Sequence, residues 1–318
     1  MSASEPRRSP LLDLPGAVFG DAPDSGVAAH YGSIVHEQRR FEAGGTFVDL
    51  SHRDVLTISG PDRLTWLHDL STQHVRDLAP GVTTSALILS PQGRIEHGFD
   101  LVDDGETVWA HTEPGAAAPL VAWLDRMRFM SRVEVREVTD EQAVIGLPGL
   151  AWELRPRATL TDLPGELGDP VGTWAWEAAR IADGRARVGL DTDELTIPNE
   201  AGLLDVAVHL DKGCYRGQET VARVHTLGRP PRRLTLLHLD GSVDHLPARG
   251  SDVTAADGRR VGAVGTSARH HELGPIALAL LKRSVDLAAP LEVDGVAASQ
   301  EVVVDPEVGL HVRPSMRG

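Results

Sequence analysis

The residues best suited to chemistry lie in one short stretch that holds the only cysteine of the chain, Cys214. Lys212 stands two residues before it, and Gly213 and Gly217 lie on either side. A thiol close to a helix N-terminus and to an ammonium group favours the thiolate, which is the reactive form. Glycine lets a backbone approach a ligand closely. Cys214 and Lys212 are therefore candidate catalytic residues; the alternative is that Cys214 is a small buried hydrophobic residue, as most free cysteines are.

A short helix is expected directly after this stretch. Gly217 can serve as its N-cap, and Glu219 places a carboxylate in the first turn, where the helix dipole favours negative charge. Apolar residues at three-residue spacing predict one buried face, made by Val221, Val224 and Leu227. Gly228, which two prolines follow closely, supplies the stop signal.

The octet from Lys212 to Glu219, Lys-Gly-Cys-Tyr-Arg-Gly-Gln-Glu, resembles the signature of the YgfZ family, the folate-binding relatives of the T-protein (aminomethyltransferase) of the glycine cleavage system. Besides the lysine and the cysteine, its motif positions are Gly213, Gly217, Gln218 and Glu219. The resemblance runs from about Gly45 to Arg283. It implies a three-lobed α+β fold with mixed antiparallel sheets, a C-terminal β-barrel and tetrahydrofolate as the cofactor.

Composition sets independent bounds. At 318 residues the chain is long enough for two or three domains, and its 32 glycines and 21 prolines indicate many turns and a large β component. A single cysteine excludes an internal disulfide and a multi-cysteine metal or iron–sulfur site within one chain. It also fits a reducing, cytoplasmic compartment.

Charge and hydropathy narrow the range of partners. The formal net charge of −15 argues against broad binding to nucleic acid. No apolar run is long enough to cross a bilayer, since the longest clear one extends only from Ile276 to Leu281. The polar, proline-containing N-terminus lacks the apolar core of a secretion signal. We therefore expect a soluble cytoplasmic protein without a membrane partner.

Three regions are expected along the chain. Residues 1–29 are predicted to be a flexible N-terminal tail, residues 30–228 a T-protein-like folate-binding region of two interleaved α+β lobes, and residues 229–318 the C-terminal β-barrel domain. Mixed strands and helices in the middle region suggest an antiparallel sheet with helices on one face. The segment 147–170, rich in proline and glycine, is expected to be a surface loop.

Individual elements follow from periodicity and turn signals. Strands are predicted over 46–50, 54–58, 83–89, 94–101, 107–111, 133–138, 143–146, 233–239 and 275–281. Helices are expected just after Ser59, over 117–129 and over 174–182. A tight turn at 90–93 joins two of the strands, and an Asp-Gly turn at 257–258 marks a further hairpin.

The resemblance also implies the folate contacts. The phrase from Thr196 to Leu203 is similar to a T-protein phrase whose glutamate holds the pterin, a role that falls here on Glu200. A carboxylate can accept two parallel N–H bonds from such a ring; the alternative is a loop acid that caps a helix. Arg233 and then Arg223 are expected at the glutamate tail, and Tyr215 completes the proposed cofactor site. The basic run after the octet is equally compatible with a solvated surface.

One departure from the T-protein pattern concerns the reaction. Where T-proteins carry an Asp-Asp pair near the reactive nitrogen of folate, this chain has His97 and Gly98. Strand alternation places Asp100 on the same face as Glu96 and opposite His97. Folate binding without aminomethyl transfer is therefore expected.

The histidines do not indicate a metal site. His270-His271-Glu272 lacks the second half of a metalloprotease motif, and we predict no bound metal. The glycines from 258 to 265 lead into a strand, which argues against a dinucleotide site. His209 is the nearest upstream histidine that could serve Cys214 in a cysteine hydrolase, but its spacing alone does not place it.

Three functions are compatible with these features. The favoured one is a folate-binding protein of the YgfZ family that supports the assembly or repair of iron–sulfur clusters in client enzymes, including tRNA-modifying ones. The second is a tetrahydrofolate-dependent aminomethyltransferase or related one-carbon transferase. The third is a non-catalytic docking protein without a working cysteine. The folate species, the clients and the oligomeric state stay open.

Overall fold

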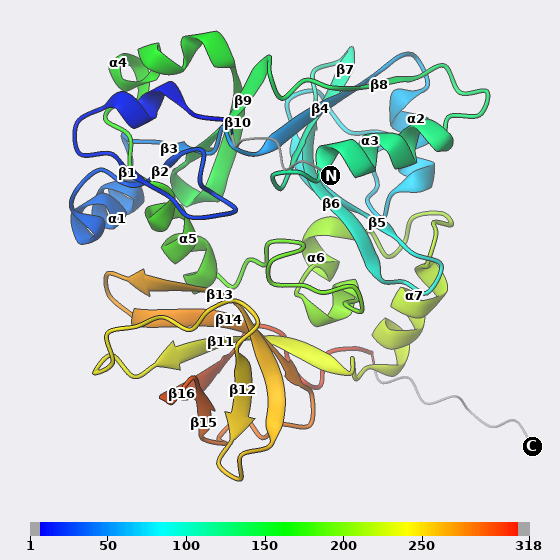
Figure 1. Ribbon diagram of the computed structural model, residues 1–318. Coiled ribbons are helices and arrows are strands. Elements are labelled where there is room, and N and C mark those ends of the chain that lie inside the picture. Colours follow the sequence, from blue (N-terminus) through cyan, green and yellow to red (C-terminus); the bar gives the residue numbers. More distant parts are fainter. Residues whose placement is uncertain (1–6, 311–318) are drawn as a thin grey trace, which may run out of the picture. The chain divides into compact units, whose positions relative to one another are not determined.

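The computed structural model describes residues 7–310, and its elements are labelled in Figure 1. The chain forms two compact units, each built from separate segments. Unit 1 comprises Met1–Arg63, Phe99–Arg180 and Ala268–Leu273, and unit 2 comprises Leu64–Gly98, Ile181–Ser267 and Gly274–Gly318. Strand β6 and helix α5 each continue from one unit into the other.

The first elements of unit 1 correct one prediction. The described part of the expected flexible tail, residues 7–29, is folded. It contains the 3-10 helix η1 (Pro10–Asp13) and the strand β1 (Val18–Phe19). Leu11 packs in a core cluster with Phe47, and Ser9 hydrogen-bonds Asp49. The apolar residues Leu11, Leu12 and Val27 are buried and anchor the segment.

Unit 1 contains a three-stranded antiparallel sheet with the order β10-β9-β3. The elements from the N-terminus to this sheet are β2 (Ala28–His30), α1 (Ile34–Ala43) and β3 (Val48–Asp49), and the two later strands are β9 (Gln142–Leu147) and β10 (Ala151–Pro156). Phe41 of α1 and Trp176 of α5 (Thr173–Ala182) pack in its core.

The segment 147–170 is not the loop that its prolines and glycines predicted. It contains β10 together with η2 (Pro148–Leu150), η3 (Arg157–Asp162) and α4 (Leu163–Leu167). Residues 151–156 pair in register with β9, so their extended form is fixed by a neighbouring strand rather than by a local pattern.

A second antiparallel arrangement in unit 1 is built around β4 (Asp54–Ser59). This strand pairs with β7 (Thr107–Thr112) on one side and β8 (Glu134–Glu137) on the other, and β7 pairs with the second half of β6 (Ile95–Asp103). Helix α3 (Ala117–Arg126) precedes β8. All of these strands and the helix were predicted within a few residues.

Unit 2 contains the predicted hairpin of β5 (Thr83–Leu89) and β6, which residues 90–93 connect. Its helices are α2 (Arg63–Leu70, which starts at the boundary), η4 (Pro198–Glu200), α6 (Leu204–Ala207) and α7 (Gln218–Leu227). Val221 of α7 packs with Leu87 and Leu89 of β5 in one apolar cluster. The hairpin and α7 therefore share a core.

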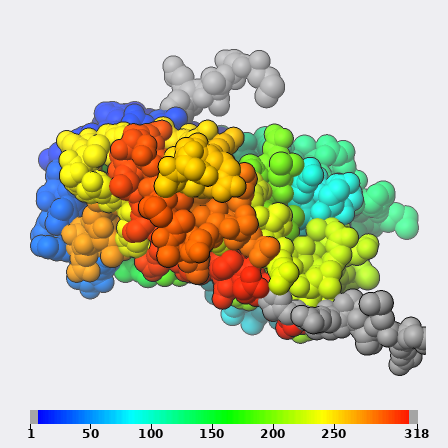
Figure 2. Space-filling view, turned by 90° about the horizontal axis from the view of Figure 1, so that it is seen from below, coloured from blue at the N-terminus to red at the C-terminus, as the bar shows by residue number. Residues whose placement is uncertain are grey.

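Six antiparallel strands close into a barrel in the order β11-β14-β13-β12-β15-β16. They are β11 (Arg232–Leu239), β12 (Asp252–Ala255), β13 (Arg260–His270), β14 (Gly274–Lys282), β15 (Leu291–Val293) and β16 (Val296–Val302). Leucine and valine side chains such as Leu237, Val253 and Leu281 fill its interior. Figure 2 shows the outer surface of these strands in yellow to red. The fold is α+β with a C-terminal β-barrel, as predicted.

No helix in residues 7–310 is long and apolar enough to cross a membrane.

Candidate functional site

Cys214 is exposed on the loop between α6 and α7. Helix α7 begins after Gly217, which is its N-cap, and ends at Gly228, so the predicted helix and both of its boundaries are confirmed. The predicted apolar face is only partly right. Val221 is fully buried, whereas Leu227 is 46% exposed. The loop thus presents its thiol to solvent rather than to the core.

Lys212 holds this loop to the end of α2. Its side chain is buried, and its ammonium group donates hydrogen bonds to the carbonyl oxygens of His68, Ser71 (2.5 Å) and Gln73 (3.3 Å). The last carbonyls of a helix have no partner within it, and a cation at the C-terminus also suits the helix dipole. The ammonium group of Lys212 therefore binds one carbonyl in the last turn of α2 and two carbonyls just after the helix. We expected this ammonium group to face Cys214, and the structure instead gives it a structural role.

Burial also shifts the pKa values of Lys212 and Tyr215, the two ionisable residues nearest to Cys214 in the buried part of the loop. It lowers the pKa of Lys212 to about 8, so the side chain is still charged at neutral pH. The ammonium nitrogen lies 5.4 Å from the centre of the Tyr215 ring, a cation–π contact. Tyr215 is 7% exposed, and burial raises its pKa to about 12. Tyr215 is therefore a packing residue of the loop rather than an open ligand contact.

The second anchor of the loop is Gly217. Its φ of 81° lies in the left-handed region, and a Cβ atom there would stand 2.5 Å from the Ser90 carbonyl oxygen and 2.8 Å from the Cα of Gly93. The loop therefore lies directly against the turn between β5 and β6. Arg216 adds an ion pair with Glu96 at 2.9 Å. Gly213, by contrast, has open space around it. Cys214 thus lies between two fixed points.

The remaining motif residues take lesser parts. Gln218 donates a long hydrogen bond of 3.5 Å to the carbonyl of Lys212 across the loop. Glu219 is exposed in the first turn of α7, where its charge suits the helix dipole.

Glu200 is 1% exposed and lies at the end of η4. Its Oε1 atom accepts hydrogen bonds from the backbone N–H and the Nε–H of Arg232, both at 3.0 Å. Its Oε2 atom accepts from the guanidinium of Arg232 at 2.9 Å and from the Ile197 backbone N–H at 3.1 Å. Four donors thus saturate the carboxylate. Glu200 therefore caps the 3-10 helix η4, which is the alternative given above for this residue.

Arg232 also pairs with Asp193, whose Oδ2 lies 2.5 Å from the guanidinium. This hydrogen bond lowers the pKa of Asp193 to about 2. Burial alone would lower the pKa of Arg232, but its bonds to Glu200 and Asp193 outweigh burial and raise it. Sequence reasoning missed Arg232 because it chose the neighbouring arginine instead.

Arg233 is completely buried. It donates hydrogen bonds to Thr235 (2.5 Å), Gln300 (2.7 Å) and the Val285 carbonyl (3.3 Å), and burial lowers its pKa. Successive residues of β11 point to opposite faces of the sheet, so Arg232 and Arg233 cannot serve one place. Arg233 joins parts of the barrel and is not available at the surface.

The structure gives a steric reason for the glycine at position 98, where T-proteins are expected to carry an aspartate. A Cβ atom on Gly98 would lie 2.7 Å from a methyl carbon of Val188. Val188 therefore fills the space that any side chain at position 98 would need, and an aspartate does not fit there without a shift of the chain.

Comparisons with known proteins agree with this architecture. Residues 11–151 match the family model described as the GCVT N-terminal domain, and residues 232–304 match the one described as the CAF17 C-terminal β-barrel domain. The crystal structure of the glycine cleavage system aminomethyltransferase T from Bartonella henselae superimposes with a TM-score of 0.78 over 94% of this chain and 97% of that one, at 18% identity. The chain has the fold of the T-protein.

Two named proteins show which kinds of protein this chain is similar to in sequence. A chloroplastic Arabidopsis thaliana protein, whose name proposes a transferase, is 24% identical over 304 residues, covering 79% of this chain and 68% of that protein. A mitochondrial iron–sulfur cluster assembly factor IBA57 homologue from Mycosarcoma maydis is 27% identical over 241 residues, covering 64% of this chain and 60% of that protein.

The residues expected to hold tetrahydrofolate do not form one open site in the described part of the chain. Glu200 is saturated by its own neighbours, Arg233 is fully buried and bonded within the barrel, and Tyr215 is packed in the core. Arg223 alone is exposed, on α7. These four side chains, as arranged, do not form the predicted tetrahydrofolate site.

A cavity of about 400 Å³ lies next to Arg232. The loop 190–193, Arg249 and residues of β13 and β14 line it, whereas Cys214 and Glu200 do not. Within unit 2, the exposed thiol and this cavity are therefore two separate features.

His209, which the sequence analysis considered as a partner of Cys214, lies in a group with two histidines that it did not identify, His68 and His74. The rings of His68 and His74 lie 4.7 Å apart, and those of His74 and His209 lie 5.2 Å apart. Burial, and next the positive charge of Lys212, lower the pKa of His68. No local spacing indicated this group, because folding alone brings its three members together.

Unit 1 contains a second histidine group, which the prediction of no metal had set aside. His271 Nε2 lies 2.7 Å and His270 Nε2 3.8 Å from the same oxygen of Glu42. The Nδ1 of His270, however, accepts backbone N–H groups of Glu272 and Leu273 at 3.2 Å. In the neutral ring the proton is then on Nε2, which leaves no lone pair there for an ion. The group is better described as hydrogen-bonded than as metal-ligating.

Proposed function

We propose that this chain, which has the T-protein fold, is a cytoplasmic protein of the YgfZ type, which binds tetrahydrofolate and supports the assembly or repair of iron–sulfur clusters in client enzymes, including tRNA-modifying ones. The octet around Cys214 supports the family assignment. The similarity to an iron–sulfur cluster assembly factor supports the role.

The observation that carries the proposal is the exposure of Cys214 on a doubly anchored loop. Lys212 fixes the loop to α2, and Gly217 fixes it to the β5–β6 turn. A thiol held in this way can serve as a ligand for iron, with little entropy left to lose on binding. One cysteine cannot complete a cluster, so the other ligands have to come from the client, a second chain or a small thiol.

Complementation of a strain that lacks the gene tests the role of the thiol. We expect the wild-type chain to restore the activity of iron–sulfur enzymes, Cys214→Ala to fail, and Gly213→Ala to succeed as the matched change next to it. An enzyme without a cluster, assayed in the same extracts, controls for general effects. Full restoration by Cys214→Ala would instead favour the docking protein without a working cysteine.

Folate binding needs a test that leaves the fold intact. Glu200→Ala does not qualify, because it unpairs Arg232. Arg223 is exposed, so Arg223→Gln is the better probe for a contact with the glutamate tail. We expect saturable binding of tetrahydrofolate, and about tenfold weaker binding of its polyglutamate form to Arg223→Gln. Lack of saturable binding by the wild type would contradict the folate part of the proposal alone.

A folate-dependent aminomethyltransferase or related one-carbon transferase is the second candidate, supported by a 25% identical aminomethyltransferase from Herpetosiphon aurantiacus. It requires a carboxylate near the folate nitrogen to handle a proton, and Gly98 cannot supply one. Asp100 is the next acid along β6. Transfer of a methylene group from an aminomethyl donor to tetrahydrofolate, lost in Asp100→Asn, would promote this candidate.

A further inference from the structure

Three histidines of unit 2 stand in a row that ends on the loop of Cys214. The ring of His68, in the last turn of α2, meets the ring of His74 edge-on with their centres 4.7 Å apart, and the centre of the His74 ring lies 5.2 Å from that of His209. His209 is five residues before Cys214. Exposure increases along the row, since His68 is buried, His74 is partly exposed and His209 is exposed. We call these three residues the histidine row.

Backbone contacts join the histidine row to the loop. His209 donates its N–H to the carbonyl oxygen of Thr72 at 3.0 Å, and its own carbonyl oxygen accepts the backbone N–H of Lys212 at 3.3 Å. At the other end of the row, the carbonyl oxygen of His68 accepts an N–H of the Lys212 ammonium group. Lys212 therefore contacts both ends of the row, and a change in the row reaches the loop through this residue.

The buried ring of His68 suits the neutral form. Its Nδ1 atom is buried and has no hydrogen-bond partner in the part of the chain that the structure describes. A protonated imidazole carries an N–H on both ring nitrogens. Protonation of His68 would therefore leave a buried donor unsatisfied, which costs free energy as long as the surrounding structure stays closed.

The charged groups around His68 also disfavour a proton there. Lys212 of the loop and Arg76 of the segment after α2 are positive, and His74 becomes positive in acid. Asp69 opposes them, but it is exposed and pairs with Arg76 at 3.2 Å. Burial, and then these positive charges, hold the pKa of His68 below its ordinary value of 6.5.

The middle ring of the row has a carboxylate beside it. The Nε2 atom of His74 lies 3.3 Å from Oδ2 of Asp77, and both side chains reach solvent. A proton on His74 is therefore accommodated by Asp77, but the new charge then lies against the ring of His68. Acid thus adds positive charge to the row next to the ammonium group of Lys212.

The anchor on the other side gains little from acid. Lys212 has a pKa of about 8, so its ammonium group is already largely charged at pH 7. Below pH 7 the repulsion within the histidine row grows, while the hydrogen bonds of Lys212 to the carbonyl oxygens of α2 and the residues after it stay as they are. An opened loop would give His68 access to water, where the ring takes up a proton more readily, so falling pH favours opening.

We propose that the histidine row is a pH-sensitive switch for the Cys214 loop. At neutral pH the uncharged rings pack together and the loop is held against α2. In acid the charged rings repel one another and Lys212, and the loop loosens while the rest of unit 2 stays folded. The switch itself depends neither on folate nor on iron–sulfur chemistry; its bearing on a client enzyme rests on the proposed function.

The single cysteine allows the loop to be observed directly. A nitroxide spin label attached to Cys214 of the full-length chain reports loop mobility by electron paramagnetic resonance, and there is no other thiol to label. We expect the mobile fraction of the label to rise about threefold or more as the pH falls from about 7 to about 5.5. Circular dichroism at each pH shows whether the protein is still folded.

Two variants of the row and one control test the assignment. His68→Phe keeps a ring of similar size without a titrating group, and its mobile fraction should stay near the value at pH 7. His74→Gln removes only the neighbouring charge and should reduce the rise about twofold. His245→Gln, a change at an exposed histidine of the same unit, should behave as the wild type does. Thermal unfolding confirms that each variant is folded.

Three results would overturn the proposal. One is a wild-type mobile fraction that does not change with pH. Another is a rise of wild-type size in both His68→Phe and His74→Gln. The third is a label that becomes mobile only where circular dichroism shows unfolding, because acid would then act on the whole fold rather than on the loop. Since mobility is the readout, failure of folate binding or of complementation would change none of these outcomes.

Discussion

The carboxylate of Glu200 and the guanidinium of Arg232 form a buried bidentate pair, with Oε1 and Oε2 bonded to separate N–H groups of one arginine at 3.0 and 2.9 Å. The pair joins η4 to the first residue of the barrel strand β11. Glu200, which the sequence suggested as a ligand contact, thus links two elements of the fold.

Glu200→Ala should therefore act on stability before it acts on binding. It leaves Arg232 without its main partner, and breaking one side of a buried ion pair costs about 3 kcal/mol or more. Urea denaturation measures the loss. Asp193→Asn, which removes the more exposed partner of the same arginine, should cost under about 1 kcal/mol. Equal losses in the two variants would show that burial of Glu200 is not what matters.

Local signals explain which parts of the site could be predicted. Gly217 and Gly228 mark both ends of α7, and the Asp-Gly pair at 257–258 lies in the turn that leads into β13, because turn and cap preferences act over a few residues. The partners of Lys212 could not be found in this way. They are backbone carbonyls of α2 and the residues just after it, which any sequence would supply, and they lie 144, 141 and 139 residues away.

The neighbouring residues Arg232 and Arg233 show a second limit of prediction from the sequence. Residues 232 and 233 both suit a ligand by type, and strand alternation requires that they face opposite ways, but it does not say which one faces inwards. Burial in the barrel decides that Arg233 is interior. The strand β10 is a similar case, since its pairing with β9 outweighs the prolines around it.

The loop geometry makes a sharp prediction for two glycines of one motif. Gly217→Ala should destabilise the protein by at least about 2 kcal/mol, because alanine resists a φ of 81° and its Cβ would overlap the β5–β6 turn. Gly213→Ala should stay within about 0.5 kcal/mol, since open space surrounds it. Thermal and urea unfolding compare the two. A Gly213→Ala loss as large as that of Gly217→Ala would contradict the assigned anchors.

Lys212 permits a direct measurement of ionisation, because the chain has only one other lysine, Lys282. Selective ¹³C labelling of lysine should give two side-chain signals, and Lys282→Arg assigns them. We expect the Lys212 signal to titrate with a pKa of about 8, as burial of its ammonium group requires.

The sign of the effect on stability follows from this shift. The folded pKa of about 8 lies below the ordinary lysine value of 10.5, so between these pH values the unfolded chain binds more protons at this site. The contribution of Lys212 to the free energy of unfolding should rise with pH across that window. Urea denaturation of the wild type and of Lys212→Met at several pH values isolates the contribution of Lys212 to the free energy of unfolding. A difference between the two that does not change with pH would refute the shift.

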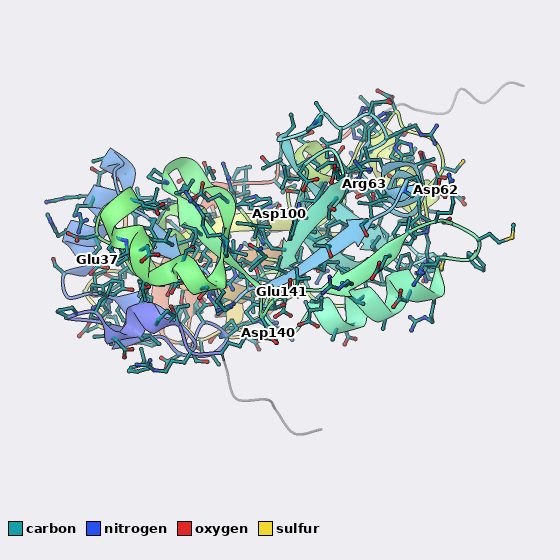
Figure 3. The ribbon with its side chains drawn as sticks, turned by 90° about the horizontal axis from the view of Figure 1, so that it is seen from above. Glu37, Asp62, Arg63, Asp100, Asp140 and Glu141 are labelled. Atoms are coloured by element: carbon teal, nitrogen blue, oxygen red, sulfur yellow. The ribbon has the colours of Figure 1, made fainter. Side chains whose placement is uncertain are left out.

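His111 should make the protein sensitive to acid. The ring lies in the interior of unit 1, 3.6 Å from Asp100, which Figure 3 labels, and neither ring nitrogen has a hydrogen-bond partner among the described residues. Burial lowers its pKa from 6.5 to about 4, and Arg53 adds to this, while Asp100 and Glu113 oppose it. The folded state therefore keeps the neutral ring at pH values where the unfolded chain takes up a proton.

Because the folded pKa is the lower one, the contribution of His111 to stability is fully present above about pH 6.5 and falls as the pH drops towards 4, by about 3 kcal/mol in all. His111→Phe removes the titrating group, so its free energy of unfolding should change less between these pH values than that of the wild type. His36→Gln, a change at an exposed histidine of the same unit, should leave the slope as it is. A wild-type slope retained in His111→Phe would mean that other groups carry the acid sensitivity.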